Sequence, residues 1–433
     1  MSYMDRVKEL IDGKKVLILG FGREGRSTFD LFSKAGCAAK ISIADANTEL
    51  SLPEEAKNVV VHTGANYQNH IFNYDIIMKS PGIVLEPQVL SELPRITSQA
   101  ELMLSWYRDQ MIGITGTKGK STTTTLLYHI LKENGKKAIL AGNIGIPAFD
   151  ILPQIEDDSV IVFEFSCHQL EYSQVSPHIA VFLNLYEEHL DHYGTFEKYK
   201  AAKMNIFNYQ NENDTLYIGD EVEGLAAEAK SRVNVCCYTK DSEEYGAYTS
   251  LLGKHNFFDI SLVARVAADL GIDKMSFIRA LKTYKPLPHR LELIGNVGGV
   301  KYYDDSISTI SETTIQALET VTDVDFVLIG GMDRGIDYSP IESYLAKRDD
   351  IRVILMYETG VRIAREMELK YEETINGDKI FLVSDLKEAV AFAGKNAKKG
   401  KSVVMSPAAA SYGYFRNFED RGEVFAALVR NIK

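Results

Sequence analysis

The chain has 433 residues, of which 45% are hydrophobic and 25% are charged, and its formal net charge is −12 at pH 7. A chain of this length exceeds what one hydrophobic core organises, so two or three domains are expected, and the ordinary composition argues against a disordered or fibrous protein. The excess of acidic residues argues against broad attachment to nucleic acid, which needs many contacts between basic side chains and phosphates.

The N-terminal segment MSYMDRVKELIDGKK lacks the apolar core of a signal peptide, and no run approaches the roughly 18 apolar residues of a membrane span. Four cysteines occur, and the adjacent pair Cys236 and Cys237 does not have the spacing of a zinc knuckle. We interpret all four as reduced thiols. These features predict a cytoplasmic protein without a membrane partner, and we expect a monomer.

The first elements read as the strand KVLILG, the glycine turn FGREG, the helix RSTFDLFSKAG and the strand AKISIAD. Alternation of strands and helices predicts a parallel sheet, and it continues as far as the helix SQAELMLSWYRD. The turn has the GxGxxG spacing, with Asp45 after the next strand, which is typical of dinucleotide binding but weak evidence alone. An NAD-dependent dehydrogenase is therefore one hypothesis for this part of the chain.

A second alternation begins at QMIGITGT and includes the strands KKAILAG, SVIVFEF and HIAVFLNL. It closes before KPLPHR, where two nearby prolines indicate a linker, and a third alternation follows Arg290. We predict an α/β protein with three domains, each a mostly parallel, doubly wound sheet. They are a Rossmann-like domain (1–106), a central P-loop ATPase domain (107–287) and a second Rossmann-like domain (288–433).

The strongest local motif lies between the strand MIGIT and the helix TTTTLLYHILKENG and reads as a shortened P-loop. Its glycines let backbone N–H groups turn toward phosphate oxygens, while Lys120 is expected to reach the terminal phosphates and Ser121 to bind Mg²⁺. A capped glycine turn without a ligand is the plain alternative, and a GTPase-like switch shares this loop. The predicted ATP-binding residues here are Gly116, Thr117, Lys118, Gly119, Lys120, Ser121 and Thr122.

Two more polar residues follow strands of the same predicted sheet. Glu164 ends the strand SVIVFEF, where a buried carboxylate is costly unless a cation or a donor meets it. His189 follows IAVFLNL, and the carboxyl ends of parallel strands meet at one ligand-binding edge. Both are candidate metal ligands, although imidazole is a less usual ligand for Mg²⁺. Taken singly, Glu164 also reads as a surface acid and His189 as a capping residue.

Eight motifs occur in the order seen in the Mur ligases: GTKGKST, EFSCHQLE, NLYEEHLDHYG, YKAAK, PHRLE, YYDDS, GGMDRG and SPAAASYGYFRNFEDRG. The chain resembles that family over essentially its whole length, and within it the branch that adds D-glutamate to UDP-N-acetylmuramoyl-L-alanine in peptidoglycan synthesis. The resemblance implies a UDP-binding first domain, a central ATPase domain and a C-terminal domain for the amino acid. It also implies that ATP phosphorylates the muramoyl-alanine carboxylate and that the glutamate amine captures the acyl phosphate.

The resemblance also assigns roles to residues. Lys203 matches a lysine that the family carries as a carbamate, which becomes an oxygen ligand for a second Mg²⁺; without the resemblance it reads as a helix-surface lysine. The implied catalytic residues are Lys120, Glu164, His189 and Lys203, and the implied metal ligands are Ser121, Glu164, His189 and Lys203. Further implied contacts are Asn256, Arg290 and Asp305 with ATP; Gly22, Arg23, Asp45, Ser80, Asn143, Ser166 and Gln169 with the UDP substrate; and Thr309, Arg334, Ser411 and Phe418 with the amino acid.

Three positions depart from the pattern of the D-glutamate branch. Ile307 stands where lysine is usual, Gly413 where aspartate is common, and Asp259 where asparagine often contacts adenine. These changes are similar to those of a branch that accepts L-glutamate. We expect D-glutamate because the D-glutamate branch is the more frequent one, and we keep L-glutamate as the second possibility. A folylpolyglutamate synthetase and a non-catalytic sensor of ATP or a UDP-sugar are two further hypotheses for the function.

Overall fold

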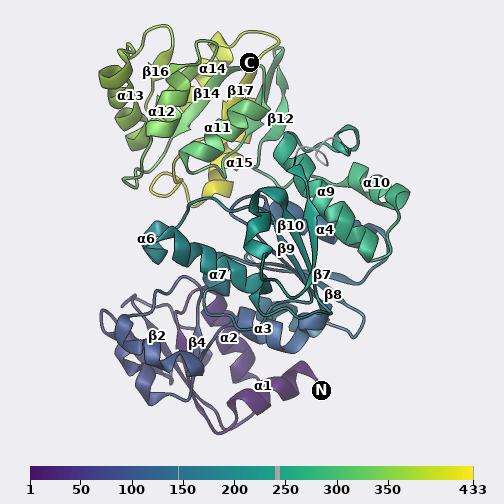
Figure 1. Cartoon of the computed structure of the whole chain (residues 1–433). Helices are drawn as coiled ribbons and strands as arrows, with labels where there is room; N and C mark the ends of the chain where they lie inside the picture. The colour runs from purple at the N-terminus through teal and green to yellow at the C-terminus, as the bar shows by residue number, and fades with distance from the viewer. Residues whose placement is uncertain (145, 239–243, 433) are drawn as a thin grey trace. The chain divides into compact units, whose positions relative to one another are not determined.

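The computed structural model describes residues 1–144, 146–238 and 244–432, which form two compact units, Met1–Tyr284 and Lys285–Lys433. The first unit contains two sheets and the second contains one (Figure 1). The predicted α/β class with three mostly parallel sheets is therefore confirmed. The predicted domain bounds after residues 106 and 287 stay predictions. Among the described residues, no helix combines the length and the apolar character that a bilayer crossing requires.

The first sheet has five parallel strands in the order β3-β2-β1-β4-β5. The chain moves outward from β1 to β3 and then returns to the other side of β1, so the order reverses between β1 and β4. Open α/β sheets bind ligands at the carboxyl ends of strands at such a reversal. The bounds are α1 (Tyr3–Ile11), β1 (Lys15–Leu19), α2 (Arg23–Ser33), β2 (Lys40–Asp45), β3 (Val60–Thr63), β4 (Ile76–Lys79) and β5 (Ile96–Thr97).

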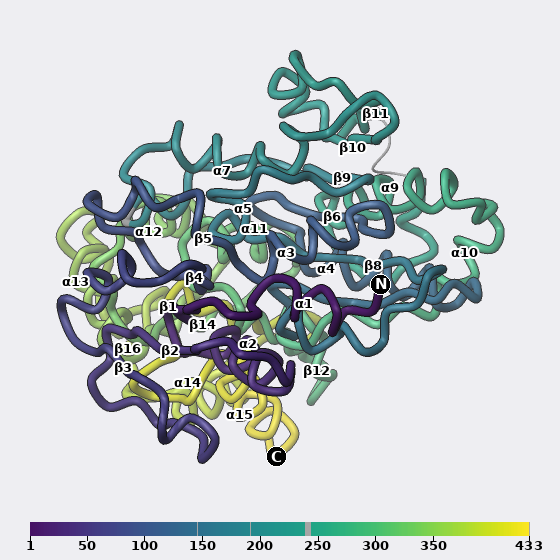
Figure 2. The backbone as a smooth tube through the Cα atoms, turned by 90° about the horizontal axis from the view of Figure 1, so that it is seen from below, coloured from purple at the N-terminus to yellow at the C-terminus, as the bar shows by residue number. Residues whose placement is uncertain are grey.

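The second sheet has six parallel strands in the order β11-β10-β9-β6-β8-β7, and Figure 2 shows β11, β10, β9 and β6 in this succession. Every residue of its central strand β6 is buried, as expected for a parallel sheet with both faces covered. The strands are β6 (Met111–Thr115), β7 (Ala138–Gly142), β8 (Val160–Glu164), β9 (Ile179–Phe182), β10 (Thr215–Gly219) and β11 (Arg232–Cys236). The helices are α3 (Gln99–Tyr107), α4 (Lys120–Glu133), α5 (Cys167–Leu170), α6 (Leu190–Tyr193), α7 (Phe196–Asn208), α9 (Lys254–Asp269) and α10 (Lys274–Thr283).

One buried amide connects the elements around these two sheets. Gln99, in the first turn of α3, donates from Nε2 to the carbonyl of Glu24 and to the hydroxyl of Thr28, both at 3.0 Å. Its Oε1 accepts from the backbone N–H of Phe149 at 3.2 Å. The rings of Phe32 and Phe149 lie 6.0 Å apart in the same hydrophobic cluster. The first two sheets therefore share a core and hold their carboxyl edges within one unit.

The third sheet has the order β12-β13-β17-β14-β15-β16, and only its edge strand β12 is antiparallel within the described residues. The strands β13 and β14, which follow each other along the chain, lie on opposite sides of β17, so the strand order reverses there. The strands are β12 (Glu292–Val297), β13 (Val300–Asp304), β14 (Val324–Gly330), β15 (Arg352–Met356), β16 (Ile380–Leu382) and β17 (Ser402–Met405). The helices are α11 (Ser311–Thr320), α12 (Ser339–Ala346), α13 (Tyr357–Tyr371), α14 (Leu386–Asn396) and α15 (Phe418–Arg430).

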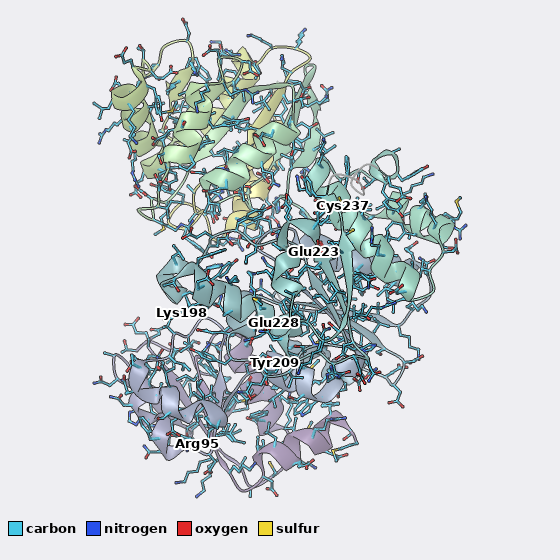
Figure 3. All side chains as sticks on the ribbon, in the orientation of Figure 1. Arg95, Lys198, Tyr209, Glu223, Glu228 and Cys237 are labelled. Atoms are coloured by element: carbon cyan, nitrogen blue, oxygen red, sulfur yellow. The ribbon has the colours of Figure 1, made fainter. Side chains whose placement is uncertain are left out.

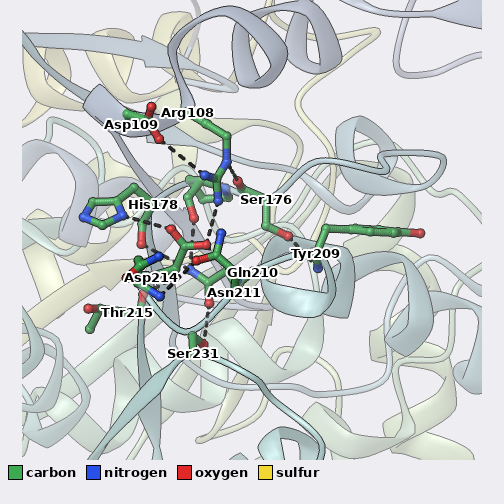
Figure 4. A network of polar contacts seen from close by, with 12 residues as sticks. Arg108, Asp109, Ser176, His178, Tyr209, Gln210, Asn211, Asp214, Thr215 and Ser231 are labelled. Carbon is green, nitrogen blue, oxygen red and sulfur yellow. Dashed lines mark hydrogen bonds and ion pairs between the residues drawn. The ribbon is translucent and has the colours of Figure 1, made fainter.

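A polar network joins the amino ends of parallel strands in the second sheet (Figure 4). Asp214, whose side chain is 1% exposed, accepts a hydrogen bond from Arg108 at 2.6 Å and lies 2.9 Å from His178 Nδ1. It also accepts from the backbone N–H of Asn211 at 2.8 Å. Burial raises the pKa of Asp214, but these hydrogen bonds outweigh burial and hold the pKa below its ordinary value. The network lies at the edge opposite the carboxyl ends of the strands, so it stabilises the sheet away from the ligand edge.

We predict that Asp214→Asn lowers the free energy of unfolding by about 2 kcal/mol, because charged hydrogen bonds to a buried carboxylate are lost while its partners stay partly exposed. Thermal unfolding would measure the loss. The deficit should be present above pH 3.8 and should shrink as the pH falls through the lowered pKa, since the wild-type carboxylate then becomes protonated. Asp109→Asn is the control, because Asp109 is 85% exposed at 3.3 Å from the same arginine. Equal melting temperatures for Asp214→Asn and wild type would contradict the prediction.

Candidate active site

The glycine loop between β6 and α4 has the backbone of a phosphate-binding turn. Gly116 and Gly119 have φ values of 159° and 82°, and α4 begins at Lys120, directly after Gly119. A Cβ at Gly116 would lie 2.9 Å from the Cβ of Leu183, so a larger residue would displace the loop. Helix N-termini bind anions because their first N–H groups have no partner within the helix. The predicted P-loop thus has the expected strand, turn and helix around it.

Two lysines meet at this loop, Lys203 buried and Lys120 half-buried. Lys120 donates to the carbonyls of Gly116 at 2.9 Å and Thr117 at 2.8 Å, and Lys203 of α7 donates to the same Gly116 oxygen at 2.7 Å. Lys203 is 1% exposed, whereas Lys198, labelled in Figure 3 near the start of α7, is exposed. Burial, and then the charge of Lys120, lower the pKa of Lys203 to about 7. Burial also lowers the pKa of Lys120. Lys203 is therefore not the helix-surface lysine that the sequence pattern alone suggests.

Glu164 lies at the carboxyl end of β8 and is 1% exposed. Its Oε1 accepts from Asn143 Nδ2 at 2.9 Å, while its Oε2 is buried and has no hydrogen-bond partner among the described residues. A buried carboxylate oxygen without a donor is costly unless a cation reaches it. Carboxylate oxygen is a preferred ligand of Mg²⁺, so the donor chemistry here fits the metal that the sequence predicts.

His189 lies beside the loop at the start of α6, with a left-handed φ of 56°. Its ring centroid is 6.1 Å from that of Tyr199, whose hydroxyl is 2.9 Å from Thr117 Oγ1. Its neighbour Glu188 forms an ion pair with Lys118 of the loop. The structure thus brings the P-loop, Glu164, His189 and Lys203 to one edge of the second sheet. Glu188 and Tyr199 were not predicted from the sequence, although Glu188 adjoins the predicted histidine.

Asp259 of α9 contacts the P-loop rather than lying at its periphery. Its Oδ2 occupies the position next to Gly119, where an added Cβ would lie only 2.4 Å from that oxygen. Burial raises the pKa of Asp259 to about 8, and a hydrogen bond with Thr123 partly opposes this shift. Burial thus favours the neutral form of this acid, which weakens its repulsion of a phosphate. Asn256, in the first turn of the same helix, donates to the Leu252 carbonyl at 2.6 Å.

The predicted nucleotide loop of the first sheet lies where the strand order reverses. Ser80, directly after β4, donates from Oγ to the carbonyl of Gly20, directly after β1, at 2.9 Å. The carboxylate of Asp45 accepts from the backbone N–H of Phe21 at 2.7 Å. No atom lies within 4 Å of a Cβ built on Gly22 at the start of α2, so there is open space beside this turn within the described residues. Arg23 follows as an exposed residue of α2.

A capping box connects this region to the second sheet. The hydroxyl of Ser166 accepts from the backbone N–H of Gln169 at 3.2 Å, and Gln169 Oε1 accepts in return from the backbone N–H of Ser166 at 3.0 Å. Gln169 also donates to Glu24 of α2 at 3.2 Å. Burial raises the pKa of Glu24 to about 6. The predicted residues Ser166 and Gln169 therefore adjoin the first sheet, while Asn143 adjoins Glu164.

In the second unit, most of the predicted residues follow β13, β14 and β17, whereas Arg290 precedes β12. Asp305 is buried, accepts from the backbone N–H of Leu291 at 3.2 Å and from Ser406 Oγ at 2.7 Å, and burial raises its pKa to about 7. Arg290 lies between His289 and Leu291, which have left-handed φ values of 61° and 52°. Such conformations are rare for leucine and indicate local strain. Both Asp305 oxygens have protein partners here, and its proposed contact with ATP stays a prediction.

The predicted amino-acid contacts gather at the same edge of the third sheet. Arg334 is exposed and donates to the carbonyl of Thr309 at 2.9 Å, which joins two of the four predicted residues. Ser306 donates to the carbonyl of Phe418 at 2.8 Å, and Ser411 is buried. Arg421 was not predicted from the sequence. Its buried guanidinium donates to Ser306 and to the carbonyl of Ala409, and so joins the loops after β13 and β17.

Comparison with known proteins agrees with these motifs. Residues 114–267 match the model of the Mur ligase middle domain, and residues 14–97 match the Mur ligase MurD-like N-terminal domain. A UDP-N-acetylmuramoylalanine–D-glutamate ligase from Koribacter versatilis is 31% identical and aligns over 98% of both chains. One from Clostridium botulinum is 32% identical over 100% of both chains.

Solved structures show the same fold at lower sequence identity. MurF from Acinetobacter baumannii has a TM-score of 0.61 at 15% identity, over 99% of this chain and 93% of that one. UDP-N-acetylmuramate–alanine ligase MurC from Thermotoga maritima has a TM-score of 0.59 at 18% identity, over 97% and 100% of the two chains. MurF from Thermotoga maritima, solved in complex with ADP, has a TM-score of 0.56 at 19% identity, over 98% and 95%. Given also the full-length relatives above 30% identity, the chain belongs to the Mur ligase family.

Proposed function

We propose that this chain is an ATP-dependent ligase that forms an amide between UDP-N-acetylmuramoyl-L-alanine and D-glutamate in peptidoglycan synthesis. The observation that carries the proposal is the meeting of Lys120, Lys203 and the unpartnered Glu164 oxygen beside the P-loop. Similarity over the whole chain to ligases of that name supports the substrates. It also favours a ligase over an NAD-dependent dehydrogenase for the first sheet. The proposal includes a cytoplasmic monomer, as the sequence predicts.

The chemistry requires two anions to approach each other. A carboxylate is a poor acyl donor, and phosphorylation by ATP gives it a good leaving group. Lys120 and the N-terminus of α4 would stabilise the negative charge that develops on the transferred phosphoryl group. The glutamate amine then attacks the acyl phosphate, which yields the amide and releases phosphate. The loop supplies the electrostatic part of this reaction with little movement, because Lys120 already lies within it.

The residues that would hold Mg²⁺ at two sites are Ser121, Glu164, His189 and a carbamylated Lys203. When bound, the metal neutralises phosphate charge. Carbamylation is supported by geometry: two ammonium groups that share the Gly116 carbonyl oxygen repel each other. A carbamate on Lys203 would be anionic and would replace this repulsion by an attraction to Lys120.

The proposal assigns the remaining predicted residues to three binding sites. Support comes from the open turn at Gly22, the position of Ser80 at the strand reversal and the guanidinium of Arg334, which suits a carboxylate. The proposed domains are 1–106 for UDP, 107–287 for ATP and 288–433 for the amino acid. The proposed contacts are Gly22, Arg23, Asp45, Ser80, Asn143, Ser166 and Gln169 for the UDP substrate; the P-loop with Asn256, Arg290 and Asp305 for ATP; and Thr309, Arg334, Ser411 and Phe418 for glutamate.

Product formation tests the proposal directly. With Mg-ATP and UDP-N-acetylmuramoyl-L-alanine, we expect phosphate release and an amide product with D-glutamate but not with L-glutamate, followed by phosphate assay and mass spectrometry. Product from L-glutamate alone would favour the other branch and make Ile307 and Gly413 candidate determinants of stereochemistry. No product with either isomer, despite binding of ATP and the UDP-sugar, would favour a sensor.

Lys120→Met is predicted to lower kcat roughly 1,000-fold, because a preorganised charge at the transferred phosphoryl group is lost. Binding of the UDP-sugar, measured by calorimetry, should stay unchanged. Lys132→Met is the matched control, since Lys132 is an exposed lysine of the same helix. Retention of more than a tenth of wild-type kcat by Lys120→Met would exclude the proposed role.

Carbamylation of Lys203 is predicted to be visible by carbon NMR of the protein in isotopically labelled bicarbonate. A carbamate signal should be present in wild type and in Lys198→Ala, whose lysine is exposed on the same helix, and absent in Lys203→Ala. Lys203→Ala should also lose turnover. A wild-type spectrum without this signal, from protein that forms product, would show that the amine acts unmodified.

A further inference from the structure

Tyr357 of the second unit has a backbone conformation that its side chain disfavours. It follows β15 directly as the first residue of α13, and its φ is 58°. Glycine adopts this left-handed conformation readily, but a bulky residue there is an outlier and carries a cost in free energy. Such a conformation persists where the surrounding contacts determine it, and it is concentrated at binding and catalytic sites. The contacts of Tyr357 therefore indicate what its position serves.

The Tyr357 side chain contacts two separate segments of the second unit. Its hydroxyl accepts a hydrogen bond from the backbone N–H of Leu386, the first residue of α14, at 3.0 Å. Its ring stacks on that of Tyr414, with the centroids 4.1 Å apart and an angle of 29° between the ring planes. It also lies 6.1 Å from the ring of Phe415 in an edge-to-face arrangement. The side chain thus joins the start of α14 to the turn that carries Tyr414 and Phe415.

This turn begins at Ser411, which the proposed function places in the glutamate site. The backbone N–H groups of Tyr414 and Phe415 both donate to the Ser411 carbonyl, at 3.4 and 3.0 Å. Ser411 is buried, whereas Tyr414 is 39% exposed and lines, together with Tyr357, a cavity of about 590 Å³. Within the described part of the chain, the stack on Tyr357 is the only ring–ring contact of Tyr414. The stack, rather than burial in a core, therefore holds this end of the turn.

The other end of the turn is connected to the start of α13 through the backbone. Thr359, in the first turn of that helix, donates from its N–H to the carbonyl of Gly331 at 3.2 Å. The next residue, Met332, donates to the carbonyl of Ala410 at 2.9 Å, directly before Ser411. The start of α13 therefore holds the chain on both sides of Ser411, by backbone hydrogen bonds before it and by aromatic rings after it.

We propose that Tyr357 is a positioning residue for the amino-acid substrate, whose ring holds the turn 411–415 in the geometry that binds glutamate. The inference rests on the proposed function, because it takes Ser411 as a glutamate contact. The ring acts through Tyr414 and does not itself touch a substrate. Loss of the ring therefore weakens the binding of glutamate and leaves the binding of ATP and the UDP-sugar unchanged.

Substitutions at Tyr357 separate the ring from the hydroxyl and from the backbone. Tyr357→Gly removes the ring but suits the left-handed backbone, so this variant is expected to fold. In assays of phosphate release, it should raise KM for the glutamate isomer that wild type uses roughly five-fold, with KM for ATP and the UDP-sugar unchanged. Tyr357→Phe keeps the ring and should retain the wild-type KM for glutamate. Tyr371→Ala is the control, because Tyr371 is an exposed tyrosine at the other end of the same helix.

A second substitution tests whether the ring acts through Tyr414. Tyr414→Leu should raise KM for glutamate as much as Tyr357→Gly does. The double variant should be no worse than either single variant, because both changes remove the same contact. If Tyr357→Gly does not fold, Tyr414→Leu decides, since Tyr414 is partly exposed and its loss leaves the core intact.

Three results would overturn the inference. An unchanged KM for glutamate means that the turn keeps its geometry without the stack. An equal rise in KM for all three substrates, or a fall in kcat alone, means that Tyr357 only supports the fold of the second unit. Additive effects in the double variant mean that the two rings act separately. Each of these, with amide formed by wild type, leaves the proposed function intact, whereas wild-type protein that forms no amide with either isomer of glutamate removes both.

Discussion

The ammonium groups of Lys120 and Lys203 share one carbonyl oxygen at the phosphate loop, and the catalytic edge of the second sheet is arranged around this contact. Lys120 comes from the loop and Lys203 from α7, and both donate to Gly116. The nearby carboxylates of Glu164 and Glu188 raise the pKa of both lysines, but burial dominates and lowers it. The edge therefore brings two lysines together where burial reduces screening by solvent and so strengthens electrostatic interactions. Its geometry is suited to anionic ligands before any ligand arrives.

In the second unit, a buried cation also holds loops together through hydrogen bonds. Arg421 is fully buried, and each of its three guanidinium nitrogens donates to a protein oxygen at the ends of β13 and β17. A planar cation with fixed donors can join two loops in one geometry, which a flexible lysine would do less well. In both units, a buried cation thus orders backbone carbonyls next to the predicted binding residues. The difference is that every guanidinium nitrogen of Arg421 donates to a protein oxygen, whereas Lys203 has one protein acceptor for its three N–H donors.

Local patterns predicted the sheets and the edge of the central site, because alternation of apolar strands and helices and the glycine spacing are encoded in short segments. Contacts between distant segments were not predictable in this way. The ion pair of Lys118 with Glu188 and the contact of Asp259 with Gly119 depend on tertiary packing. Gly413 stands where aspartate is common in the D-glutamate branch. Its φ is 85°, and a Cβ there would meet no atom within 4 Å of the described chain. Aspartate at this position would be strained by the backbone rather than by its neighbours.

The acid beside the P-loop has a consequence for the stability of the fold. Burial raises the pKa of Asp259 from its ordinary 3.8 to about 8, so the folded chain holds a proton there at pH 7 that the unfolded chain releases. Folding at neutral pH therefore takes up a proton, and the contribution of this residue to stability falls as the pH rises between these two values. The nucleotide loop is thus built next to a group that opposes folding under ordinary conditions. A neutral asparagine there would remove this proton uptake and make the stability of the second sheet less dependent on pH.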